Sequence, residues 1–156
     1  MRSIVFCSSQ RFKKELNEFI ENLRFLAKTK GVHLVIFDPE FKFDHNGNSE
    51  HFHLLPEKER MKDEFYKTEV AGKVYDHLFR KVKVADICFI FNKGGYLGAN
   101  TNGELFAAAM ADKLIYALED KTLMGNFPHE LYEEPSSRKL IHEIVSTPED
   151  LLSRLL

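Results

Sequence analysis

The sequence lacks tryptophan altogether and holds only two cysteines, Cys7 and Cys88, in 156 residues. Both cysteines fall inside short apolar runs, where a free thiol behaves as a small hydrophobic side chain. This scarcity favours two buried, reduced thiols of a cytosolic protein over a framework of disulfide bonds.

An excess of charge of either sign is also missing, since 22 Lys and Arg residues face 24 Asp and Glu residues. With no basic stripe and no acidic tail, the sequence does not predict a nucleic acid polymer as a partner. No apolar run approaches membrane-spanning length, and the run at residues 1–7 is too short for a signal peptide. We therefore expect a soluble, cytoplasmic protein with no membrane partner.

What is present is a regular alternation of apolar strands and amphipathic helices. The length predicts one domain over residues 1–156. Strands are predicted at residues 3–7, 32–37, 86–91, 113–118 and 140–145, helices at 11–30, 61–82, 104–110 and 146–156, and loops at 39–59 and 119–138. This order predicts a doubly wound α/β fold, Rossmann-like or flavodoxin-like, with a mostly parallel five-stranded sheet and helices on both faces. Such sheets bind ligands at the carboxyl ends of their strands.

The segment at residues 82–118 carries the most specific pattern, a strand followed by a glycine-rich loop, a short helix and another strand. Glycines let the loop backbone take positive φ and approach a ligand closely. Residues 100–103 offer N-cap oxygens, and free N–H groups there favour an anion or a sugar phosphate. The predicted ligand contacts are Asn92, Gly94, Gly95, Tyr96, Gly98, Thr101 and Asn102. An ordinary strand-to-helix turn is the alternative.

A second polar group stands where the first strand meets its helix. Backbone N–H groups, the hydroxyls of Ser8 and Ser9 and the guanidinium of Arg11 could together hold a phosphate. A capped helix with a solvated arginine is the other interpretation. Glu104, expected at the start of the short helix, is either a nucleophile toward a sugar or an acid stabilised by the helix dipole.

The stretch ADICFIFNKGGYLGANTNGELFAAAMADKLIYALE, residues 85–119, resembles the core of the nucleoside 2-deoxyribosyltransferase-like superfamily. It is similar to a less characterised branch with a GGYLG-type loop, and more distantly to Lonely Guy-type phosphoribohydrolases. The resemblance implies that Glu104 is the nucleophile that attacks the anomeric carbon of a deoxyribonucleoside. It also favours ligand contact by Ser8, Ser9 and Arg11, and it implies a homodimer or higher homo-oligomer whose pockets are completed by a neighbouring chain.

Two carboxylates of that family have no counterpart here, because their positions correspond to Gly98 and about Leu78. Protonation of a departing base would then fall to another group, such as His77 or a loop histidine. Asp76 and His77 are the candidates on the second predicted helix, although an exposed helical face explains either. Asp86, at the amino end of its strand, is expected to be structural.

The predicted loop at residues 39–59 holds His45, His51 and His53, which could suggest a metal site over the open end of the sheet. Because no carboxylate pattern of known spacing accompanies them, we predict no metal and no cofactor. Two functions remain open. One is cleavage or transfer at the N-glycosidic bond of a small nucleoside or nucleotide, with Glu104 as nucleophile or oxocarbenium stabiliser; the other is a non-catalytic module that binds or senses a nucleotide in the same pocket.

Overall fold

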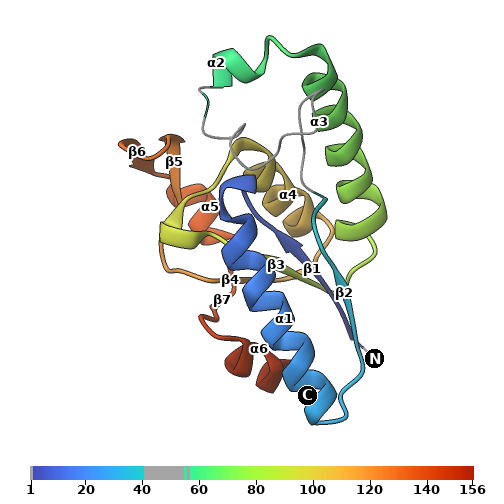
Figure 1. The fold of residues 1–156 in the computed structure, drawn as a ribbon. Helices are drawn as coiled ribbons and strands as arrows, with labels where there is room; N and C mark the ends of the chain where they lie inside the picture. Colours follow the sequence, from blue (N-terminus) through green and yellow to red (C-terminus); the bar gives the residue numbers. More distant parts are fainter. Residues whose placement is uncertain (1, 41–54, 56) are drawn as a thin grey trace.

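A parallel sheet of five strands forms the centre of the protein (Figure 1). The computed structural model describes residues 2–40, 55 and 57–156. The strands lie in the order β2-β1-β3-β4-β7, and every neighbouring pair is parallel. Their bounds are β1 Arg2–Cys7, β2 Leu34–Phe37, β3 Ile87–Ile90, β4 Leu114–Ala117 and β7 Glu143–Ile144. The predicted α/β fold with a parallel five-stranded sheet is confirmed.

Helices cover both faces of this sheet. The helices are α1 Lys13–Thr29, α2 Glu57–Arg60, α3 Glu64–His77, α4 Ala99–Met110, α5 Pro135–Lys139 and α6 Pro148–Leu155. A 3-10 turn at Gln10–Phe12 precedes α1, another at Lys93–Gly95 follows β3, and a π-helix at Leu78–Val82 continues α3. None of the helices within the described residues combines the length and the apolar character needed to cross a membrane.

Successive side chains of the central strands point to opposite faces of the sheet and form two separate apolar layers. Ile4 and Phe6 of β1 pack with α1 and α6, and the rings of Phe6 and Phe89 lie 5.1 Å apart in this aromatic layer. Val5 and Cys7 face the other way and pack with α4. Small side chains, among them Cys88, line this second layer, which lets α4 approach the sheet closely.

Both cysteines are buried, as predicted. Their sulfur atoms lie 3.8 Å apart, a contact between two thiols rather than a disulfide bond. Cys7 ends β1 and Cys88 lies in β3, so both belong to the layer beneath α4. This layer, and not the aromatic one, therefore carries both thiols of the core.

The prediction of one regular helix at residues 61–82 was wrong in two respects: which side chains face the core, and where the α-helix ends. The helical spacing of its apolar residues predicts that Phe65 and Phe79 face the core, yet they are 43% and 50% exposed. Helix α3 also ends at His77, where the chain widens into a π-helix that shifts the helical register.

The predicted loop at 119–138 was also wrong. Part of it forms the antiparallel hairpin of β5 Leu123–Asn126 and β6 Glu130–Glu133, and Pro135 begins α5. This hairpin carries few buried apolar side chains, so alternation could not reveal it. The loop predicted at 39–59, including His45, His51 and His53, falls mostly outside the described residues.

Candidate functional site

The site lies where the two central strands, β1 and β3, end. Helix α1 follows β1 onto one face of the sheet and α4 follows β3 onto the other, which opens a crevice between them. A pocket of about 260 Å³ occupies this position. It is lined by Ser8, Ser9, Gln10, Arg11, Arg60, Met61, Tyr66, Val70, Tyr96, Gly98, Ala99, Asn100 and Thr101.

Six of the predicted contacts line this pocket: Ser8, Ser9, Arg11, Tyr96, Gly98 and Thr101. They come from the turn after β1 and from the loop that enters α4, two segments nearly ninety positions apart in sequence. Arg60 and Tyr66 complete the pocket from α2 and α3. Sequence reasoning missed both: Arg60 follows an irregular segment with no local signal, and Tyr66 lies in a predicted helix whose pattern does not show which side chains turn toward the pocket.

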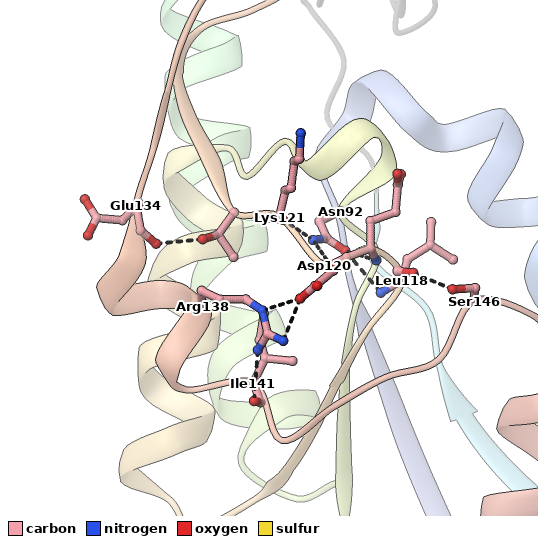
Figure 2. A network of polar contacts seen from close by, with 10 residues as sticks. Asn92, Leu118, Asp120, Lys121, Glu134, Arg138, Ile141 and Ser146 are labelled. Carbon is pink, nitrogen blue, oxygen red and sulfur yellow. Dashed lines mark hydrogen bonds and ion pairs between the residues drawn. The ribbon is translucent and has the colours of Figure 1, made fainter.

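Asn92 was predicted to contact a ligand, but it instead holds two segments of the protein together. Its side chain is fully buried and bridges β3 to the segment after β4 (Figure 2). Nδ2 donates to the carbonyls of Glu119 and Lys121 at 3.0 and 2.7 Å, and Oδ1 accepts from the N–H groups of Leu118 and Glu119 at 3.1 and 3.0 Å. All four hydrogen-bonding positions of the amide are thus used inside the protein.

Three other predicted contacts interact with neighbouring parts of the protein outside the pocket: Gly94, Gly95 and Asn102. The N–H of Gly94 donates to the carboxylate of Glu119. At Gly95, φ is +86° and a Cβ would come within 2.8 Å of the Cβ of Lys121, so glycine is required for packing. Asn102 accepts a 2.6 Å hydrogen bond from the hydroxyl of Ser137 in α5. None of the three is among the described residues that line the pocket, and ligand contact by them stays a prediction.

Helix α4 begins earlier than predicted, at Ala99, with Gly98 as its N-cap in an extended conformation. Residues 100–103 therefore form the first turn instead of preceding it. Glu104, expected at the helix start, lies in the second turn and is buried. A carboxylate at that depth lies away from the end of the helix, so the helix dipole does not account for its position.

Glu104 lies within a buried group that we call the Cys7–His77–Glu104 cluster. Its Oε2 atom is 3.6 Å from Nε2 of His77, and that nitrogen is 3.4 Å from Sγ of Cys7. The three side chains come from α4, the end of α3 and the end of β1. The sequence singled out Glu104 and His77 separately, but only the folded sheet brings them together.

Two members of the cluster, Cys7 and Glu104, are close in the chain to residues of the pocket wall. Ser8 follows Cys7 directly, and Thr101 precedes Glu104 by one helical turn on the same face of α4. Val70 precedes His77 by two turns of α3. The cluster therefore lies next to the inner wall of the pocket, beneath α3 and α4.

The alternative of an exposed helical face was wrong for His77 and correct for its neighbour Asp76. His77 is only 5% exposed, whereas Asp76 points outward and pairs with Arg80 at 3.4 Å. Adjacent residues of a helix point in directions about 100° apart, so only one of the two can enter the core. The proposal of Asp76 as an acid–base group is therefore corrected.

The thiol of Cys7 is kept neutral by its surroundings. Complete burial raises its pKa well above the ordinary value of 9.0, and the hydrogen bond and charge of Cys88 and the charge of Glu104 act in the same direction. A protonated thiol is a weak nucleophile. The reactive capacity of the cluster therefore rests with the carboxylate of Glu104 and the imidazole of His77.

The sulfur, nitrogen and oxygen donors of the cluster lie within 4.8 Å of one another, and no other set of three such side chains does so in the part of the chain that the structure describes. Cysteine, histidine and glutamate are ligands of zinc. Zinc binding would require the thiolate of Cys7, which burial disfavours. The absence of a metal and of a cofactor stays a prediction.

Comparison with known proteins supports the fold. No family model matches the chain, and no curated protein matches its sequence. A conserved protein from Enterococcus faecalis V583 has a similar structure, with a TM-score of 0.59 and 19% identity over 98% of this chain and 96% of that one. A 2-deoxyribosyltransferase from the psychrotolerant bacterium Bacillus psychrosaccharolyticus superimposes with a TM-score of 0.47 and 17% identity over 96% of this chain and 89% of that one. The first of these likenesses supports the fold and nothing more.

Proposed function

We propose that the protein cleaves or transfers the N-glycosidic bond of a nucleoside or nucleotide, with Glu104 and His77 as the reacting pair. The observation that carries this proposal is the 3.6 Å separation between the carboxylate and the imidazole. The pair adjoins a pocket at the carboxyl ends of β1 and β3, where open α/β sheets bind their ligands.

The two side chains supply the two groups that this reaction needs. A Glu104 oxygen attacks C1′ of the sugar or stabilises its oxocarbenium-like transition state as the bond to the base breaks. The bond electrons leave with the base, which takes a proton from the imidazolium of His77. Water then attacks C1′, gives its proton to His77 and releases Glu104. If a free base attacks C1′ in place of water, the sugar is transferred to that base.

The proposal is tested by incubating the protein with pooled deoxyribonucleosides, ribonucleosides and their 5′-monophosphates, with and without a free acceptor base. Base release or exchange is followed by chromatography. Glu104→Gln is expected to abolish turnover while the melting temperature shows a folded protein, and His77→Gln to slow it by about 100- to 10,000-fold. Asp76→Asn, one residue away but outward-facing, is the matched control and should leave the rate unchanged. Wild-type turnover by Glu104→Gln would refute the assignment.

A second function is favoured by the depth of the reacting pair. The side chains of His77 and Glu104 are only 6% and 8% exposed, and neither lines the pocket as its described residues define it. On this alternative the pocket binds or senses a nucleotide without turning it over. Measurable binding with no base release from any member of the pool would select it.

We also propose that the protein assembles as a homodimer or higher homo-oligomer. Large apolar side chains are exposed on α3, the following π-helix and α4, namely Tyr75, Phe79, Phe106 and Met110. The rings of Tyr75 and Phe79 lie 4.7 Å apart, so these two side chains form one exposed apolar surface. Clustered exposed apolar side chains of this kind are typical of protein interfaces.

A further inference from the structure

Among the described residues that line the pocket, the charged ones are all positive, although the protein as a whole carries a net charge of −2. Two guanidinium groups line it, from Arg11 in the turn after β1 and from Arg60 at the end of α2. No aspartate or glutamate is among the described residues that line it. Arg60 is 6% exposed, so its charge acts in surroundings from which most water is excluded.

A third positive element is the start of α4. Gly98, its N-cap, has no side chain with which to cap the helix, and no side-chain hydrogen bond is made there. Gly98, Ala99, Asn100 and Thr101 all line the pocket, so the first N–H groups of a twelve-residue helix are directed to it. Helix N-termini of this kind favour an anion.

Hydroxyl groups complete the donor set. The Oγ atom of Ser9 accepts the N–H of Arg11 at 3.3 Å, which leaves its own O–H to donate toward the pocket. The guanidinium of Arg11 lies 5.0 Å from the ring centre of Phe127, which limits its movement. Guanidinium groups, backbone N–H groups and hydroxyls are hydrogen-bond donors, and together they match the several acceptor oxygens of a phosphate.

From these observations we infer that the ligand of the pocket is a nucleoside 5′-monophosphate, whose phosphate is bound by Arg11, Arg60 and the start of α4. The inference rests on the proposed function for the nucleoside part of the ligand. Thr101 lies three residues from Glu104, a rise of about 4.5 Å along α4, so a single nucleotide can reach both the anion-binding groups and the reacting pair.

Gly98 allows a test in which the chain itself supplies a competing anion. A Cβ there would lie 3.9 Å from both the Cβ of Ser9 and the hydroxyl oxygen of Tyr96, and φ is −72°, so a side chain fits without strain. Gly98→Asp would cap α4 and place a carboxylate in the pocket. Gly98→Asn has nearly the same shape without the charge and is the matched control.

Binding is measured by calorimetry with deoxynucleoside 5′-monophosphates, the matching deoxynucleosides and inorganic phosphate, in a Glu104→Gln background that prevents turnover. We expect the monophosphates to bind at least about tenfold more tightly than the nucleosides. Arg60→Gln and Arg11→Gln should each weaken monophosphate binding by about 10- to 100-fold. Arg2→Gln, an exposed charge at the opposite end of β1, should have no effect.

Gly98→Asp should lose monophosphate binding far more than Gly98→Asn does, which keeps the inference testable if Arg60→Gln fails to fold. Equal affinities for nucleosides and monophosphates, or equal effects of Asp and Asn at position 98, would overturn it. Arg60-dependent monophosphate binding without any base release by the wild type would uphold the inference and refute the enzyme. Base release from nucleosides, with no preference for the monophosphates, would uphold the enzyme and refute the inference about the phosphate.

Discussion

The Nε2 atom of His77 lies 3.6 Å from the Oε2 atom of Glu104, and this pair links the end of α3 to the second turn of α4 inside the protein. Buried polar pairs of this kind are strongly coupled, because removing one partner leaves the other in surroundings that solvate it poorly. The pair therefore has a measurable structural effect that is independent of any ligand.

We expect a double-mutant cycle of Glu104→Gln and His77→Gln to show a coupling of about 1–3 kcal/mol in the free energy of unfolding. Urea denaturation of the wild type, both single variants and the double variant gives this value. Simple additivity of the two single effects would show that the side chains do not interact in solution. Glu104→Gln with Asp76→Asn is the control cycle, for which additivity is expected.

The thiol of Cys7 should make the protein sensitive to alkali. Burial holds its folded-state pKa above the ordinary value of 9.0 that applies to the unfolded chain. The folded state therefore keeps a proton that the unfolded state loses, so stability is complete below pH 9.0 and falls as the pH rises beyond it. Unfolding free energies measured across this range should decline less steeply in Cys7→Ala. An identical slope in both proteins would contradict the prediction.

The carboxylate of Asp86 is expected to matter at the opposite end of the pH scale. Hydrogen bonds from the backbone N–H and the hydroxyl of Ser3, each 2.9 Å, lower its pKa below the ordinary 3.8. Its contribution is present above pH 3.8 and is lost as the pH falls through the lower, folded-state value. Asp86→Asn should reduce stability by about 1 kcal/mol at neutral pH and less in acid. Equal losses at both pH values would argue against the assignment.

Two glycines of the same loop should respond differently to alanine. Gly95→Ala introduces a Cβ at φ +86° and 2.8 Å from the Cβ of Lys121, so we expect a loss of about 1–3 kcal/mol in unfolding free energy. Gly98→Ala has ordinary backbone angles and space, so its effect should stay within about 0.5 kcal/mol. Chemical denaturation of the two variants side by side measures the difference, and similar losses would contradict the loop geometry.

Light scattering tests the proposed assembly. We expect a mass of at least two chains, with Met110→Glu shifting it toward one chain, because Met110 is 86% exposed beside Phe106 on α4. Phe25→Glu is the matched control, since Phe25 is 69% exposed on α1, on the other face of the sheet. A one-chain mass for the wild type would refute the proposal.

The core of the fold could be predicted because its signals are local. Ile87–Ile90 and Leu114–Ala117 are short apolar runs, a pattern that suits strands covered on both faces. The end of the chain was equally clear, since Thr147 caps α6 and Pro148 occupies its first turn.

The site could be predicted only in part, because its arrangement depends on contacts between distant residues. Asn92 follows an apolar strand, as ligand-binding polar residues do, yet its amide is fully engaged by the backbone after β4. His77 has exposed neighbours along the chain, and only the packing of α3 on α4 shows that it is buried beside Glu104. Arg60 carries no local signal at all.

The bare start of α4 gives the protein a property that does not depend on knowing its reaction. Any molecule that supplies the missing cap at Gly98 stabilises the folded state, by an amount that grows with the logarithm of its concentration relative to its Kd. Compounds from a cell extract could therefore be ranked by how far each raises the temperature at which the protein melts. The natural ligand would be recognised by heat resistance before any chemistry on it had been observed.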